Sequence, residues 1–142
     1  MWAKGHRFQP ENRGPILAEH LVAYAEASGD KNRIHLDPSF ASESGFPSVI
    51  VHGMLSMSFL GDYLIQFFPE TGFSLALFRA RFKHVTFPGD ILTCQGEVRE
   101  ISDDKEVVVH VWATNVEGEL VTDAECRFRV VVPEKIVQLA GS

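Results

Sequence analysis

The stretch YAEASGDKNRIHLDPSFASESGFPSVIVHGM, residues 24–54, decides how the rest of the chain is organised. It must leave one helix, form a loop, form a short helix and enter another helix. Gly29 is typical of the left-handed position just past a helix end. Asp37 followed by Pro38 is typical of an N-cap and a first helical residue, and Gly45 ends that short helix. We therefore expect the reactive side chains of the chain in this segment.

Two helices flank this segment. Residues 16–28 have apolar side chains at helical spacing, which predicts an amphipathic helix with Pro15 at its first position. Residues 52–68 are apolar nearly all round, which predicts a buried helix, and Pro69 and Gly72 end it. The second helix is the element that a sheet would have to cover.

After Gly72 the hydrophobic pattern changes to a period of two, which is typical of strands. It predicts four strands at residues 73–87, 91–101, 105–116 and 119–132. Short turns between them favour an antiparallel meander, and Lys4–Gln9 is a candidate edge strand. The sequence thus indicates one α+β domain over residues 1–142, in which an antiparallel sheet wraps a long central helix.

Composition excludes several classes of function. The 142 residues carry a net charge of −6, so there is no basic excess to meet nucleic acid or an anionic membrane surface. No run of 18 apolar residues is free of polar breaks, and a membrane span is not expected. Cys94 and Cys126 lie in predicted strands, and with no signal peptide in view they are expected to be reduced thiols of a cytoplasmic protein; pairing between neighbouring strands in an oxidising compartment is the alternative.

The candidate reactive residues lie in the opening stretch. Asp30 and His35 share the loop after the first helix, five residues apart, where a carboxylate and an imidazole could hold one water; a capping Asp beside a surface His is the alternative. His52 and Gly53 open the apolar helix, whose first N–H groups are unpaired and favour a developing negative charge. The six histidines show no zinc-type spacing, so no metal is expected.

The motif SGDKNRIHLDPSFA, residues 28–41, followed by VIVHGML, residues 49–55, resembles the signature of MaoC-like dehydratases and R-specific enoyl-CoA hydratases. The resemblance runs from about Leu17 onward. One departure is Arg33, where the family usually has Pro. The resemblance implies the hotdog fold and a hydro-lyase that converts a trans-2-enoyl-CoA reversibly to the R-3-hydroxyacyl-CoA, with coenzyme A as part of the substrate and no further cofactor.

For Gly53 the resemblance also implies that its backbone N–H binds the thioester oxygen. We expect Asp30 to be the base and His35 its partner, a division of roles that the sequence leaves open. Asn32 and His52 are expected to contact substrate, and Met57, Leu60 and Tyr63 are expected to line the acyl pocket because they face away from the single polar flank of their helix. The alternative for Asn32 is that its amide fastens the loop, and the alternative for His52 is that it is only a polar residue at the start of the helix.

Other functions of the same substrate class stay open. They are a hotdog acyl-CoA thioesterase, a dehydratase acting on acyl-carrier protein, and a non-catalytic acyl-thioester binding protein. The stripe of Arg79, Arg81 and Lys83 could receive coenzyme A phosphates, although any solvated sheet face shows such alternation. A long sheet edge and an apolar helix in so small a chain predict a homodimer.

Overall fold

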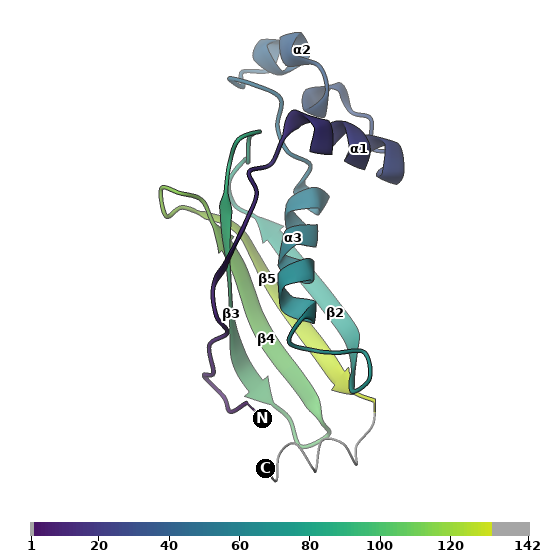
Figure 1. The fold of residues 1–142 in the computed structure, drawn as a ribbon, viewed down its shortest axis with the longest axis vertical. Helices are drawn as coiled ribbons and strands as arrows, with labels where there is room; N and C mark the ends of the chain where they lie inside the picture. Colours follow the sequence, from purple (N-terminus) through teal and green to yellow (C-terminus); the bar gives the residue numbers. More distant parts are fainter. Residues whose placement is uncertain (1, 132–142) are drawn as a thin grey trace.

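The structure, a computed structural model, describes residues 2–131. Its helices are α1 (Ala18–Ser28), the 3₁₀ helix η1 (Arg33–His35), α2 (Pro38–Glu43) and α3 (Gly53–Ile65), and its strands are β1 (Glu11–Arg13), β2 (Phe73–Phe82), β3 (Leu92–Ile101), β4 (Glu106–Thr114) and β5 (Leu120–Val130). Figure 1 shows α3 lying along one face of the sheet, with α1 and α2 gathered beyond one end. The predicted α+β architecture around a central helix is confirmed within this range.

The five strands form one antiparallel sheet in the order β1-β3-β4-β5-β2. The prediction of a four-strand meander was wrong at one point, because β2 pairs with β5 and not with β3. The segment between β2 and β3 instead crosses to the helical end of the molecule. There the carbonyl of Thr86 accepts a hydrogen bond from Val51 N–H at 2.8 Å, and Gly89 N–H donates to the carbonyl of Ile16. This crossing segment supports the loop that precedes α3.

The core lies between α3 and the inner faces of β3, β4 and β5. Leu60 and Tyr63 of α3 are fully buried, and so are Val98 and Val109 of the strands they cover. The expectation that the helix is buried all round was wrong on one flank, since Met54 is 56% exposed and Ile65 is 52% exposed. One chain of this size supplies only one sheet, which cannot cover the whole circumference of an apolar helix.

Several predicted boundaries differ from those of the structure. Strand β2 ends at Phe82, not at residue 87, because the chain turns there into the crossing segment. Helix α1 begins at Ala18, with Pro15 outside it. The edge strand is β1, whereas the predicted segment Lys4–Gln9 contributes only an isolated bridge from Arg7 to Glu97. The last predicted strand and the predicted domain extend past residue 131 into positions outside the described residues.

The two thiols are free, and both are buried. Burial raises the pKa of Cys94 to about 11 and that of Cys126 to about 12, so both stay protonated at neutral pH. Across residues 2–131, the helices are too short or too polar to cross a bilayer.

Candidate functional site

The loop between α1 and α2 holds Asp30 in place by short-range hydrogen bonds. Gly29 ends α1 in the left-handed conformation, at φ 80°, as predicted. Asp30 N–H donates to Ser28 Oγ at 3.1 Å, and Asp30 Oδ1 accepts from Asn32 N–H at 3.3 Å. Asn32 Oδ1 in turn accepts from Ile34 N–H and caps η1, so the prediction that Asn32 fastens the loop is confirmed. Asp30 Oδ2 lies free of these loop hydrogen bonds.

His35 is oriented by a backbone carbonyl. Its Nδ1 lies 2.8 Å from the carbonyl oxygen of Ile50. Because a carbonyl only accepts hydrogen bonds, Nδ1 must carry the proton, and in the neutral ring Nε2 must carry the lone pair. That Nε2 lies 3.9 Å from Asp30 Oδ2. The structure therefore brings the predicted pair together, with two proton acceptors facing one another across a gap too long for a direct hydrogen bond.

The two partners differ in their access to solvent. The side chain of His35 is 11% exposed, whereas that of Asp30 is 53% exposed. The carboxylate of the pair is therefore accessible to solvent, whereas the imidazole is largely shielded from it.

His52 lies beneath the pair and is 1% exposed. Its Nε2 is 3.1 Å from the carbonyl oxygen of Asp30, and its ring stacks on that of His35 with centroids 3.8 Å apart and planes 22° apart. Tyr24 of α1 also contacts the ring, at 4.7 Å. Burial lowers the pKa of His52 below the ordinary value for histidine, against an opposing effect of the hydrogen bond to Asp30.

Asp30, His35 and His52 offer ligand atoms within 4.8 Å of one another, a spacing that a metal ion could bridge. The stacking of the two rings argues against it, because stacked imidazoles direct their lone pairs side by side rather than toward one point. In addition, Nε2 of His52 is hydrogen-bonded to the Asp30 carbonyl and is therefore occupied. The absence of a metal stays a prediction.

The first turn of α3 presents unpaired backbone donors beside this cluster. The carbonyl of His52 accepts from the N–H groups of Leu55 and Ser56, at 3.0 and 3.2 Å. Within residues 2–131, the N–H groups of Gly53 and Met54 have no hydrogen-bond partner, and the side chain of His52 does not cap the helix. Two free donors at the positive end of a helix are suited to a developing oxyanion.

Close packing also favours a glycine at position 53. A Cβ at this position would lie 3.2 Å from the ring of Phe82, at the end of β2. The same pair of residues lines a cavity of about 240 Å³, with Ser56 and Lys83 also on its wall. A glycine here lets the strand approach the helix, and it leaves room for a ligand beside the free N–H groups.

The predicted acyl contacts lie along α3, away from the pair. Leu60 and Tyr63 are fully buried, and the Tyr63 hydroxyl donates to the carbonyl of Gln9 at 2.9 Å. Burial raises the pKa of Tyr63 to about 12. Met57 is half-buried. These placements make Leu60 and Tyr63 core residues, and a role in acyl binding stays a prediction for all three.

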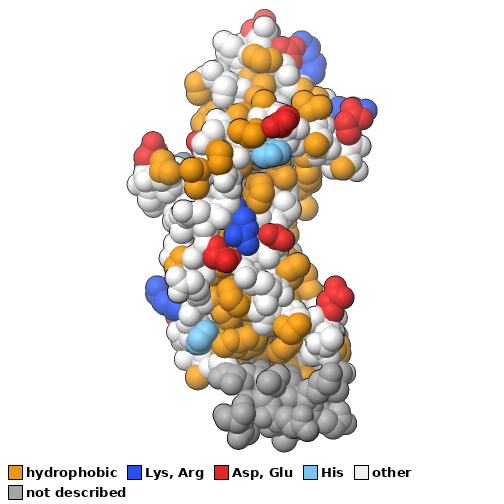
Figure 2. All heavy atoms as spheres, in the orientation of Figure 1, with side chains coloured by type: hydrophobic (Ala, Val, Ile, Leu, Met, Phe, Trp, Pro, Cys, Tyr) orange, Lys and Arg blue, Asp and Glu red, His pale blue; other side chains and the backbone are white. Residues whose placement is uncertain are grey.

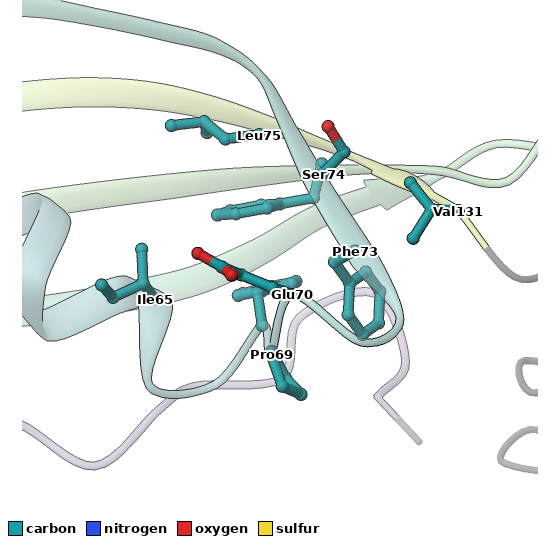
Figure 3. A pocket seen from close by; sticks show the side chains of 9 residues that line it. Ile65, Pro69, Glu70, Phe73, Ser74, Leu75 and Val131 are labelled. Atoms are coloured by element: carbon teal, nitrogen blue, oxygen red, sulfur yellow. The ribbon is translucent and has the colours of Figure 1, made fainter.

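A larger hollow, of about 640 Å³, lies at the opposite end of α3. Figure 3 shows Ile65, Phe73 and Leu75 around it, with Glu70 on its wall. Because Ile65 ends the helix that Gly53 begins, this hollow is separated from Asp30 and His35 by the length of α3.

Sequence reasoning missed three contributors to the site. Ile50 acts through its backbone carbonyl, so its side chain gives no signal in the sequence. Tyr24 of α1 contacts the ring of His52, a neighbour 28 residues away that helical spacing does not reveal. Phe82 contacts Gly53, and this contact depends on how strand and helix pack.

The comparisons with known proteins agree with this geometry. A family model described as MaoC like domain matches residues 3–132. An (R)-specific enoyl-CoA hydratase of Aeromonas caviae is 38% identical over 90 residues, which cover 63% of this chain and 67% of that protein. A 3-hydroxybutyryl-CoA dehydratase of Methylorubrum extorquens is 28% identical over 125 residues, covering 88% of this chain and 80% of that protein.

The solved structures agree on the fold. The (R)-hydratase from A. caviae involved in PHA biosynthesis superposes with a TM-score of 0.81 at 29% identity, over 90% of this chain and 96% of that chain. The ChsH1–ChsH2 complex from Mycobacterium tuberculosis gives a TM-score of 0.81 at 18% identity, over 92% of this chain and 99% of that chain. The architecture is thus the hotdog fold of these dehydratases. The chain belongs to the family of MaoC-like domains.

Proposed function

We propose that this chain catalyses the reversible hydration of a trans-2-enoyl-CoA to the R-3-hydroxyacyl-CoA. The observation that carries the proposal is the lone pair of His35 Nε2 facing the carboxylate of Asp30 across 3.9 Å. The similarity to an (R)-specific enoyl-CoA hydratase and a 3-hydroxybutyryl-CoA dehydratase supports the reaction class and its stereochemistry.

The pair suits the activation of one water. Two acceptors 3.9 Å apart can each accept one hydrogen bond from a single water placed between them. The oxygen of that water attacks C3 of the enoyl group, and Asp30 accepts the proton it gives up while His35 orients it. The same pair returns a proton to C2, so the elements of water add to one face of the double bond. In the reverse direction these steps eliminate water.

The free N–H of Gly53 stabilises the charge that develops on the thioester oxygen. Attack at C3 pushes electrons onto that oxygen, and the start of α3 offers unpaired donors beside the pair. Loss of one such donor costs about 3 kcal/mol in other enzymes that use them. The cavity shared by Gly53 and Phe82 supports a thioester placed at this spot.

Only part of the basic stripe is placed to help bind coenzyme A. Arg79 and Arg81 lie opposite Glu125 and Asp123 of β5 in the sheet register, beside acidic side chains rather than at the Gly53 cavity. Lys83 follows the strand and lines the cavity at Gly53. We assign Lys83, and neither arginine, to a phosphate or the pantetheine arm of the substrate.

A second copy of the chain is proposed to cover the exposed flank. In the described part of the chain, β2 forms one edge of the sheet, and it carries Leu75 and Phe82, which are 47% and 50% exposed. Figure 2 shows apolar side chains on the face of the molecule where α3 lies. Pairing of two β2 edges would join the sheets and bury Met54 and Ile65. The buried, unpaired thiols support the predicted cytoplasmic location.

The test is turnover of crotonyl-CoA by the purified protein, followed as loss of enoyl absorbance, with free thiol measured in the same samples. We expect absorbance to fall without release of thiol. Release of coenzyme A at the same rate would identify a thioesterase, and binding without either change would identify an acyl-thioester binding protein. Conversion only of the acyl-carrier-protein thioester would replace the proposed substrate.

A further inference from the structure

His52 is buried and contacts both members of the reactive pair. It holds the backbone of Asp30 through Nε2, at 3.1 Å from the carbonyl oxygen, and it holds the ring of His35 by stacking at 3.8 Å. We propose that His52 is a positioning residue, which sets the spacing and orientation of Asp30 and His35 from below and takes no part in proton transfer. This inference rests on the proposed hydration and assigns a role in it that is distinct from substrate binding.

The contacts of His52 determine its protonation state. Since the Asp30 carbonyl can only accept, Nε2 of His52 carries a proton. Nδ1 is buried and has no hydrogen-bond partner within residues 2–131. A proton on Nδ1 would therefore add a buried charge and a buried, unsatisfied donor. His52 is thus held neutral with its hydrogen on Nε2, while His35 is held with its hydrogen on Nδ1.

This arrangement serves two needs of the pair. The carboxylate of Asp30 is half exposed, and the hydrogen bond from His52 spans 22 residues of sequence to fix its backbone. The ring of His35 has one hydrogen bond to Ile50, which sets its direction but still permits the ring to tilt about that bond. A flat neutral ring 3.8 Å away removes that freedom. Tyr24, which contacts the ring of His52 at 4.7 Å, limits the movement of His52 itself.

A neutral ring also has an electrostatic consequence. During turnover His35 can share the proton of the attacking water, and a second positive charge stacked against it would oppose this. The groups that face His52 are Asp30, His35 and Tyr24, and among these only Asp30 favours protonation of His52, first through its backbone carbonyl and then through its carboxylate. Burial of Nδ1 keeps His52 uncharged during turnover.

Three variants separate the two contacts. His52→Gln keeps a donor for the Asp30 carbonyl without a ring, His52→Phe keeps the ring without a donor, and His52→Leu keeps neither. We expect kcat with crotonyl-CoA to fall about tenfold in each of the first two and about 100-fold in the third, the size of loss that a misplacement near 1 Å produces. KM should change by less than about twofold, because uniform substrate binding is unaffected. His6→Gln, at an exposed histidine, is the matched control.

The pH profile distinguishes positioning from catalysis. The acid limb of kcat/KM reports ionisations of the free enzyme. If His52 only positions the pair, this limb persists in His52→Gln at reduced activity. Loss of the limb in His52→Gln would make His52 a proton-transfer group and overturn the proposal. The proposal would also be overturned if folded His52→Leu kept a kcat within about threefold of the wild type, because the loss predicted from misplacement is far larger.

A second measurement does not depend on activity. Nitrogen-15 spectra of the imidazole rings in the unliganded protein should show neutral His52 with its hydrogen on Nε2, and the neutral form of His35 with its hydrogen on Nδ1. The Nδ1–H of His35 should exchange with solvent faster in His52→Leu than in the wild type. If the wild type fails to hydrate crotonyl-CoA but these spectra hold, the proposed function fails and the positioning of the pair stands. A protonated His52, or a neutral His52 with its hydrogen on Nδ1, would overturn the positioning itself.

Discussion

Replacement of His35 by Asn removes one half of the reactive pair and keeps its anchor. The amide nitrogen of Asn occupies nearly the same place as Nδ1 of histidine, so it can still donate to the Ile50 carbonyl, now 2.8 Å from Nδ1. What disappears is Nε2, which lies 3.9 Å from Asp30 Oδ2. The substitution therefore tests the lone pair that faces the carboxylate, with little change to the loop that holds it.

The size of the effect follows from these contacts. General acid–base assistance contributes about 10²–10⁴-fold, which is about 3–5.5 kcal/mol of transition-state stabilisation. The stability of the fold should change much less. The variant loses the stacking of His35 on His52, worth about 0.5–1.5 kcal/mol, and retains the hydrogen bond to Ile50. In a chain of this length that loss lowers the melting temperature by less than about 8 °C.

The assay is the initial rate of crotonyl-CoA hydration, measured beside thermal unfolding, with His6→Asn at an exposed position as the control. We expect His35→Asn to lose at least about 100-fold in kcat. The double variant with Asp30→Asn should be little worse than either single variant, because both residues serve one water. Additive losses would refute a shared water, and a folded His35→Asn with a rate near that of the wild type would refute the role of Nε2.

Three further predictions follow from the packing around the site. Gly53→Val should cost about 1–3 kcal/mol of stability, because even a Cβ would lie 3.2 Å from the ring of Phe82; an unchanged unfolding curve would show that this contact is not tight. Cys94 and Cys126, with pKa values of about 11 and 12, should not react with thiol reagents at neutral pH until the protein unfolds, and rapid labelling of the native protein would contradict their burial. Because the pKa of His52 lies below 6.5, the unfolded chain binds more protons than the folded one as the pH falls. The free energy of unfolding should therefore decline from pH 6.5 down to the folded pKa, and decline less in His52→Gln; an identical pH dependence in the two proteins would exclude this contribution.

Local chemistry made much of the site predictable. Gly29 ends α1 and the side chain of Asp37 caps α2, since each of these features depends on a few neighbouring residues. The period of two after Gly72 predicted the ends of β3, β4 and β5 to within about two residues of the observed ends, wherever the structure describes them. The proximity of Asp30 and His35 followed from the motif they share. Such features require no knowledge of distant contacts.

Long-range contacts account for what was missed. Pro15 lies outside α1 because the chain before the helix is bound to the turn after β2, where Ile16 N–H donates to the carbonyl of Asp90 at 3.0 Å. The period of two continues past Phe82, yet the strand ends there because Lys83 and His84 both donate to the carbonyl of Val121. A sequence window contains none of these partners.

The position of His52 shows the same limit. The motif marked it as a polar residue at the start of a helix, and only the fold brings it under Asp30 and His35. Its buried Nδ1 is the kind of feature that no pattern of residue types reveals.

The central claim is that the carboxylate of Asp30 activates the water that adds to the enoyl thioester. Asp30→Asn tests it most directly, because the substitution is isosteric, lies at a half-exposed loop position and opens no cavity. Its amide oxygen can still accept from Asn32 N–H, so the loop should keep its shape. The measurement is kcat for crotonyl-CoA hydration in wild type and Asp30→Asn, with melting temperatures from the same preparations. The account predicts equal melting within a few degrees and a loss of at least about 100-fold in kcat; a folded Asp30→Asn with near wild-type turnover would contradict it.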